Sequence, residues 1–297
     1  MFAEAPISGT EHVVPAVRFH LAAPPLRDLV TSYYIVDAPG PLHDSLHPEW
    51  ANIRFGFAGI WEFEDFHSDD ILTAPVATLF GPTDRGRRFS TSGGSTLGIG
   101  LTPLGWLRLV GGDAGRVANR ILPLGNALGV DGMTIGRKLT ACATELERVA
   151  YLDALLTRRA ARSSSREELT RRAHAALVAG EIEDVGDFAA QVGVERRTLN
   201  RLCVRVFGFT PVRLLARQRF LRTLGAVRDS LDRPLSEVID GAYYDQAHFN
   251  RDFKAFMGLT PMAYFISPRV VLRRAGTERH KALGAAVQGL HPAKPRD

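Results

Sequence analysis

A stretch of the sequence near its C-terminus occurs twice, with an offset of fifty residues. Residues 195–201 and 208–211 form the first copy, and residues 245–251 and 258–261 form the second. Both copies carry an Asn-Arg pair at the same point, in Asn200-Arg201 and Asn250-Arg251. A repeat of this length is one supersecondary unit built twice. The C-terminal part of the chain is therefore predicted to contain two equivalent structural units.

The first copy predicts two short helices separated by a tight turn. A supporting helix is expected over residues 181–192, where apolar side chains recur at helical spacing. These are Ile182, Val185, Phe188, Ala189 and Val192. After a break at Gly193-Val194, a second helix begins near Glu195, and Gly208 is expected to end it. Its buried stripe consists of Leu199, Leu202, Cys203 and Val206. With Pro211 opening the next helix, the pattern is that of a helix-turn-helix unit.

The second copy repeats this arrangement. Its supporting helix contains Leu235, Val238, Ile239 and Ala242. Tyr243-Tyr244 occupies the turn, and Asp245 is a good N-cap for the second helix. The buried stripe of that helix is Phe249, Phe253 and Phe256. A single helix over residues 212–227 joins the copies, and such a rigid connection suits two successive major-groove segments roughly 34 Å apart on one face of a duplex.

The outward faces of the two second helices carry amide and guanidinium groups. In the first copy these residues are Arg196, Arg197, Asn200 and Arg201, and in the second they are Gln246, Ala247, Asn250 and Arg251. Asn and Gln side chains can bond adenine bidentately, and Arg can bond guanine in the same way. We therefore predict these eight residues as the DNA-binding set. The alternative for the asparagines is an ordinary surface amide, and the division between base and phosphate contacts stays open.

Charge is distributed unevenly along the chain. Residues 1–160 contain 14 basic and 17 acidic side chains, whereas residues 161–297 contain 23 and 15. The basic excess coincides with the repeat, as expected for phosphate contact, although a solvated basic face is the plainer alternative. Cys142 and Cys203 are predicted to be two reduced core thiols in helices. No apolar run typical of a signal peptide or a transmembrane span is found, so we expect a cytoplasmic protein.

The first half of the sequence predicts a β-rich domain. Residues 18 to about 103 have the alternation and the Gly and Pro punctuation of short strands. One such strand, interrupted at Gly59, contains Ile53, Phe55, Phe57, Trp61 and Phe63. Helices are expected from Trp106 to Val110 and over residues 139–156, the latter with Cys142 and Leu146 on its apolar side. The polar stretch 158–168 is the predicted boundary, which gives an α+β chain with domains at 1–160 and 161–297.

Residues from about 182 to 265 resemble the DNA-binding domain of the AraC family of bacterial transcription regulators. The matching segments are 187–190, 197–202 and 208–211 in the first unit and 243–254 and 258–261 in the second. One departure is Gly241-Ala242-Tyr243, where the family usually has a Gly directly before the aromatic residue and one more residue in the preceding helix. The resemblance implies a regulator of transcription, specifically an activator, with operator DNA and RNA polymerase as partners.

The first half resembles, less specifically, the cupin-like N-terminal domain of AraC-type regulators. Its local marks are the turn Gly81-Pro82-Thr83 and the stretch from Gly98 to Gly105. The resemblance implies a small β-barrel or β-sandwich that binds a small-molecule effector, and a helical segment that pairs two chains as a homodimer. It implies no cofactor.

Other candidate sites are weak. His43, His47 and Glu49 have a spacing that a metal site can use, but Pro41 and Pro48 bracket them, so we predict loop histidines and no metal. No nucleophile–base constellation is recognised, so no catalytic residue and no enzyme activity are predicted. The alternative function is a cupin-type metalloprotein or enzyme with an appended DNA-binding domain.

Three further segments are interpreted as structural. Residues 92–95 are expected to be a flexible hairpin turn, because a phosphate loop would need a following Lys. Asp65, Asp69 and Asp70 are assigned to a solvated loop. Trp50, Trp61 and Trp106 are explained by core packing at least as well as by an effector pocket. The tail from Arg269, with Arg273, Arg274, Arg279 and Lys281, is predicted to be a weakly ordered extension, with phosphate contact as the alternative.

Overall fold

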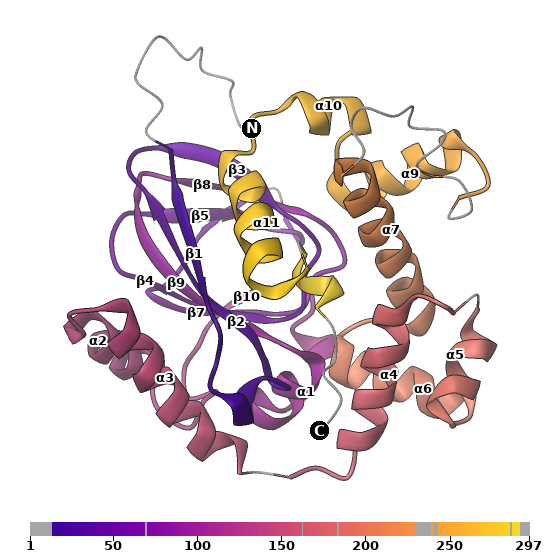
Figure 1. Ribbon diagram of the computed structural model, residues 1–297, viewed down its shortest axis with the longest axis horizontal. Helices are drawn as coiled ribbons and strands as arrows, with labels where there is room; N and C mark the ends of the chain where they lie inside the picture. The colour runs from indigo at the N-terminus through magenta and orange to yellow at the C-terminus, as the bar shows by residue number, and fades with distance from the viewer. Residues whose placement is uncertain are drawn as a thin grey trace.

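The computed structural model describes residues 14–229, 239 and 243–291, apart from 69, 162, 183 and 286. A β-rich part comes first and a helical part follows, as predicted (Figure 1). One sheet has the strand order β1-β2-β9-β4-β7-β10 and the other has the order β3-β8-β5-β6. The strands are β1 Ala16–His20, β2 Val30–Ala38, β3 Leu42–Leu46, β4 Asn52–Gly56, β5 Trp61–Glu64, β6 Ile71–Thr73, β7 Ala77–Phe80, β8 Arg87–Thr91, β9 Gly94–Leu101 and β10 Ile121–Pro123.

The two sheets share an apolar interior. Val36 of β2, Trp61 of β5 and Phe89 of β8 belong to one buried cluster that joins both sheets. All strand pairs are antiparallel, so each strand can bury one face between the sheets and expose or cover the other. The predicted β-rich fold class is confirmed, in the form of two separate sheets that enclose a common core.

Two of the turns that carry the chain from one sheet to the other differ from the prediction. The single strand expected from Ile53 to Phe63 is two strands, β4 and β5, which lie in different sheets. Gly59 stands between them with φ of 74°, which a residue with a side chain rarely adopts. The segment 92–95 was expected to be a hairpin, but it links β8 to β9 across the two sheets. Gly93 and Gly94 supply the positive φ angles of this crossing.

The elements after β9 are mostly helical and vary in length. The helical elements are α1 Pro103–Gly105, a π-helical turn at Trp106–Val110, α2 Gly132–Ala141, α3 Glu145–Ala160, α4 Glu167–Ala179, α5 Val185–Val192, α6 Arg196–Leu202, a π-helical turn at Cys203–Phe207, α7 Pro211–Asp229, α9 Gln246–Met257, α10 Pro261–Ile266 and α11 Val270–Leu283. Single 3-10 turns occupy Pro24–Leu26, Ala114–Arg116 and Gln288–Leu290. Within the described ranges each helix is too short or too polar to cross a bilayer.

The one long helix predicted over residues 139–156 was wrong. Two helices, α2 and α3, meet at a break around Cys142, whose backbone is extended. The cause is a capping box: the Thr144 hydroxyl accepts from the Glu147 N–H, and the Glu147 carboxylate accepts from the Ala143 N–H. Consequently Leu146, predicted to be apolar core, is 71% exposed. Cys142 is a half-exposed free thiol, whereas Cys203 is free and buried as expected.

The fifty-residue repeat is confirmed in the described residues. Helix α6 begins at Arg196 and α9 at Gln246, and Gly208 and Gly258 end the paired segments with φ of 88° and 71°. The Asp245 side chain caps α9, whereas Glu195 makes no such bond to α6. Leu235, Val238, Gly241 and Ala242, assigned to the second supporting helix and its turn, lie outside the described residues.

The first supporting helix is shorter than predicted. It begins at Val185, because the Asp184 carboxylate accepts hydrogen bonds from the N–H groups of Gly186 and Asp187. Ile182 precedes the helix but still packs against the core of the first unit. The expected apolar side of the unit is therefore confirmed, and only the starting residue of its first helix is wrong.

Helix α7 joins the two units and lies against the β-rich part. Leu214 at its start belongs to the core of the first unit, and Phe220, Leu221 and Leu224 belong to the core of the second. Between them the fully buried Arg217 donates to the Thr83 carbonyl at 2.9 Å and lies 3.8 Å from the centroid of the Trp50 ring. Arg213 forms an ion pair with Asp84 at 2.7 Å. One straight element therefore fixes both units relative to each other and to the sheets.

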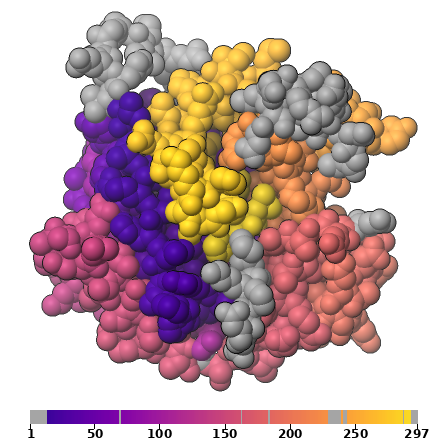
Figure 2. Space-filling model, in the orientation of Figure 1, coloured from indigo at the N-terminus to yellow at the C-terminus, as the bar shows by residue number. Residues whose placement is uncertain are grey.

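The C-terminal tail is an ordered helix, so the predicted weakly ordered extension was wrong. Helix α11 lies along β1 and next to β3 on the surface of the β-rich part (Figures 1 and 2). Its first turn is capped from another element, since the Asp44 carboxylate of β3 accepts from the N–H groups of Val271 and Leu272 at 2.7 and 3.1 Å. Val271 is buried against the inter-sheet cluster. Apolar contact and this distant cap together explain the order of the segment.

Candidate nucleic-acid interface and ligand pocket

The face of α6 that was predicted to contact DNA, called its reading face below, is open to solvent. Arg196, Arg197, Asn200 and Arg201 are all exposed, while Leu199 and Leu202 on the opposite side are buried. Among the hydrogen bonds of the described residues, this set contributes one side-chain bond, from Arg201 to the Thr198 hydroxyl at 3.4 Å, which is weak. The guanidinium and amide groups of this face are therefore available to a partner.

The face of α9 has the same construction. Gln246, Ala247, Asn250 and Arg251 are exposed, and Phe249 and Phe253 on the reverse side are fully buried. Lys254 adds a further exposed cation one turn later on this helix. The structure thus brings each predicted set of four together on one helix, and the two helices lie at opposite ends of α7 (Figure 1).

The C-terminal end of α9 and the end of the π-helical turn after α6 contact the same region of the β-rich part. The Gly86 N–H donates to the Phe256 carbonyl at 2.6 Å, and Met257 lies directly beside Gly86. In the first unit, Gly208 packs against Pro82 and Ala118. The loop from Pro82 to Gly86, between β7 and β8, therefore contacts both units, and the predicted turn at residues 81–83 contributes the contact with the first unit. Sequence reasoning assigned this turn only to the fold of the first half.

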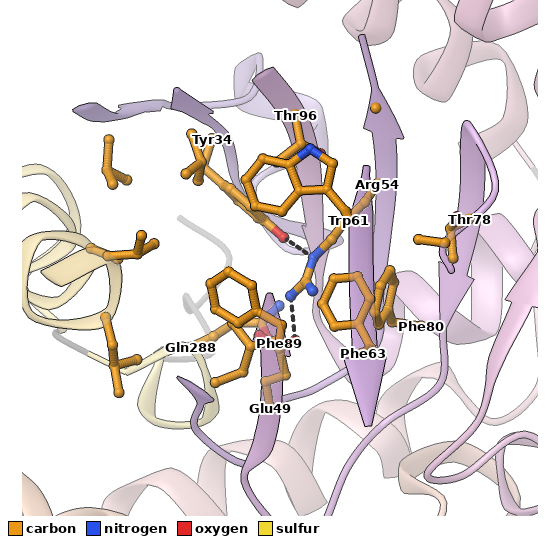
Figure 3. A pocket seen from close by; sticks show the side chains of 18 of the residues that line it. Tyr34, Glu49, Arg54, Trp61, Phe63, Thr78, Phe80, Phe89, Thr96 and Gln288 are labelled. Carbon is orange, nitrogen blue, oxygen red and sulfur yellow. Dashed lines mark hydrogen bonds and ion pairs between the residues drawn. The ribbon is translucent and has the colours of Figure 1, made fainter. Parts of the chain in front are cut away.

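A cavity of about 270 Å³ opens between the two sheets (Figure 3). Its aromatic walls include Tyr34, Trp61, Phe63, Phe80 and Phe89. Of the three tryptophans considered from sequence, Trp61 lines this cavity, whereas Trp50 and Trp106 pack in other parts of the core. Helix α11 and the turn at Gln288–Leu290 contribute part of its wall, so residues that follow the second unit help to enclose it.

Inside the cavity a buried polar cluster is built around Arg54. Its guanidinium contacts the Glu49 carboxylate at 2.6 Å and the Tyr34 hydroxyl at 2.8 Å (Figure 3). The Arg54 carbon also lies 4.1 Å from the centroid of the Phe80 ring. Burial raises the pKa of the Glu49 carboxyl, an effect that the positive charge of Arg54 opposes. Sequence reasoning missed Arg54, because an isolated Arg in a strand gives no local signal.

The histidine assignments were partly wrong. His43 lies on strand β3 and not in a loop, because the segment between Pro41 and Pro48 pairs with β8. His47 lines the cavity, and its ring lies 2.6 Å from the Tyr264 hydroxyl. Among the described residues, no group of three or more His, Cys, Asp or Glu side chains has the arrangement of a metal site. Asp65 and Asp70 do lie in the loop between β5 and β6, whereas Asp69 falls outside the described residues.

Acid destabilisation is expected from two buried histidines. Desolvation lowers the pKa of His47 and of His174 from 6.5 to about 3, so both rings stay neutral in the folded protein. The unfolded chain protonates them below pH 6.5, and unfolding therefore takes up protons as pH falls from 6.5 toward 3. The free energy of unfolding should decrease over this window, by as much as about 1.4 kcal/mol per pH unit for each histidine.

Urea unfolding at a series of pH values measures this slope. The His174→Gln variant should reduce the slope by about one proton relative to wild type. A slope between pH 6.5 and 4 that is identical in the two proteins would contradict the assignment of a neutral buried His174.

The helical units match a known domain. Residues 188–266 match the model of a helix-turn-helix domain. This confirms the AraC-type resemblance of these residues, which include both second helices. No curated protein matches the chain.

Solved structures with a similar arrangement include two of ToxT from Vibrio cholerae. One is the wild-type protein with bound unsaturated fatty acid, at 12% identity and a TM-score of 0.43, covering 86% of this chain and 96% of that chain. Another is bound to (E)-4-(8-methylnaphthalen-1-yl)but-3-enoic acid, at 9% identity and a TM-score of 0.45, covering 84% and 98%. The AraC-like transcriptional activator CuxR matches at 14% identity and a TM-score of 0.27, covering 70% and 86%. Similarity at this level determines neither a ligand nor a mechanism.

Proposed function

We propose that this chain is a transcription regulator that binds specific operator DNA through α6 and α9. One observation carries the proposal: two helices at the same position of a confirmed repeat both expose an Asn-Arg pair and bury the opposite face. A helix-turn-helix unit places its second helix in the major groove, where amide and guanidinium groups read base edges. Arg196, Arg197, Asn200 and Arg201 would contact one groove segment. Gln246, Ala247, Asn250 and Arg251 would contact the next.

The proposal is tested by selecting bound fragments of genomic DNA with the purified chain. A regulator should recover a small set of sites that share a motif and bind far more tightly than unrelated DNA, typically by a factor of about a thousand or more. Recovery of fragments without any shared motif would contradict specific binding. The selected operator is then the substrate for the remaining experiments.

Binding should weaken steeply as salt is raised. The chain carries a formal charge of +5, and its excess of basic side chains lies in the part that contains both units. Each phosphate neutralised by Lys or Arg releases condensed counterions, so log K should fall linearly with log salt, with a slope of about −0.9 per phosphate contact. Fluorescence anisotropy between 50 and 300 mM KCl measures the slope. An operator affinity that does not change with salt would exclude phosphate contacts as a major contribution to binding.

The cavity between the sheets is the proposed control site. Its walls come from both sheets and from α11, and α11 directly follows α10 of the second unit in sequence. A ligand there would touch the β-rich part and the end of the helical part at once, which supports control of DNA binding by a small molecule. In this proposal residues 1–160 form the sensing domain and residues 161–297 the DNA-binding domain, with α11 returning to the first. Contact with RNA polymerase, pairing of two chains and a cytoplasmic location stay predictions.

A further inference from the structure

We propose that the cavity between the sheets binds an apolar molecule that carries a single negative charge, and that Arg279 of α11 holds that charge. The inference rests on the proposed role of the cavity as the control site and names the class of its ligand. It depends on the balance of buried charges and on the walls of the cavity.

The residues that line the cavity favour a ligand that is mostly apolar. Trp61 and Phe89 stack with ring centroids 6.0 Å apart, and Phe63 and Phe80 meet edge to face at 4.9 Å. Aliphatic side chains from β1, β2 and α11 complete the lining, including Val17, Val36 and Val271. A ligand enclosed by such walls must gain most of its binding energy from buried apolar area.

The charged side chains that line the cavity do not balance. Arg54 is neutralised by Glu49, with which it makes a short ion pair. Arg279 also lines the cavity, and its Nη1 atom is buried without a hydrogen-bond partner among the described residues. Its guanidinium carbon lies 4.6 Å from the centroid of the Phe19 ring, a contact that supplies no counter-charge. Burial lowers the pKa of Arg279, which shows the unfavourable setting of this cation.

Among the described residues, no carboxylate forms an ion pair with Arg279. Glu49 attracts Arg279 through space and opposes the fall in its pKa, but the Glu49 carboxylate is already bonded to Arg54. Protonation of Glu49, which burial favours, would only increase the positive excess by releasing Arg54. His47 is neutral because desolvation lowers its pKa to about 3. Arg279 is half-buried, but its Nη1 atom is buried without a hydrogen-bond partner, and a charged hydrogen bond to a carboxylate would relieve the cost of burying that atom. The missing partner is therefore an anionic group brought in by the ligand.

Because Arg279 lies on α11, a ligand bound to it would contact the helical part of the chain as well as the sheets. The apolar body would rest against the two sheets, while the anion would contact a helix that begins four residues after α10 ends. The same helix is already held at its N-terminus by Asp44 of β3. A bound anion would add a second attachment near its other end, so occupancy should stabilise the docking of α11 on the β-rich part.

The experiment compares acids with neutral amides of the same shape. The full-length protein is titrated with 2-naphthoate, 2-naphthamide, decanoate and decanamide by isothermal titration calorimetry and by tryptophan fluorescence, to which Trp61 of the cavity contributes. At least one acid should bind at least tenfold more tightly than its amide, because only the acid supplies the missing charge. Failure of both acids to bind, or equal affinity within each pair, would overturn the proposal.

Two variants test whether Arg279 causes the preference for the acid over its amide. Arg279→Met keeps the length of the side chain and should remove the preference for the acid, with little change in amide binding. Arg274→Met, an exposed position on the same helix, should leave the preference unchanged. Without ligand, Arg279→Met should melt at the same temperature as wild type or higher, because it removes a guanidinium whose Nη1 atom is buried without a hydrogen-bond partner. Undiminished acid binding by Arg279→Met would refute the assignment.

The proposal of an anionic ligand and the proposal of a DNA-binding regulator can be tested separately. Operator binding by the same preparations is measured by anisotropy without any ligand. Operator binding combined with no acid preference would reject the anionic ligand and keep the proposed function. If neither operator binding nor a preference for the acid is observed, the proposed function is rejected as well.

Discussion

Replacing Arg201 and Arg251 together with alanine is expected to lower operator affinity by about two to four orders of magnitude. Each side chain is exposed on the outer face of its helix, opposite a fully buried stripe. A good base contact is worth about 1–3 kcal/mol, and contacts in two separate groove segments should add. Each single variant should show roughly half of the combined free-energy loss.

The control for this experiment removes the same charge elsewhere. Arg137 is an exposed residue on α2 that donates a hydrogen bond to the Thr134 hydroxyl of the same helix. Arg137→Ala should bind the operator as wild type does at equal salt. The melting temperature of the double variant should match that of wild type, since neither arginine contributes to a core. Wild-type operator affinity in the double variant would refute the assigned reading faces.

Truncation of Phe253 is expected to give the largest loss of stability. This side chain is fully buried in the second unit, where its ring lies 5.3 Å from Phe220 and 5.1 Å from Tyr264, measured between centroids. Phe→Ala in a packed core typically costs about 3–5 kcal/mol, since it removes apolar contact and leaves a cavity. Hydrogen exchange of the α9 amides should therefore report an opening free energy lowered by that amount, and operator affinity should fall with it.

Lys254 provides the matched control because it follows Phe253 on the same helix but is exposed. Lys254→Ala should leave the protection of the α9 amides nearly unchanged. It should also weaken operator binding only modestly, by removing one cation. Equal protection of α9 in Phe253→Ala and in wild type would show that this aromatic cluster does not hold the second unit together.

The repeat made the helical part highly predictable. Its offset, its Gly ends and its apolar stripes are local features, so a reader of the sequence can place Phe249 and Phe253 inside and Asn250 outside without coordinates. The starting residues of helices were less predictable. Asp184 shortens the first supporting helix, and the capping box at Thr144 divides a continuous apolar pattern into two helices. Such caps depend on a few side-chain bonds that compete with hydrophobic periodicity.

The cavity was beyond sequence reasoning for a different reason. Its polar group joins Tyr34, Glu49 and Arg54 from separate places in the first half. Arg279 comes from a tail that was expected to be weakly ordered. Only the packing of α11 on β1, and the cap that Asp44 gives it, place this residue beside the others. Contacts between residues more than two hundred positions apart leave no periodic signal in a single sequence.

The central claim is that α6 and α9 enter two successive major-groove segments of one operator. Hydroxyl-radical footprinting of wild type and the two single arginine variants tests it most directly. Wild type should protect two segments about one helical turn apart on one face of the duplex. Arg201→Ala should weaken protection in one segment and Arg251→Ala in the other. A single protected segment, or loss of the same segment in both variants, would contradict the claim.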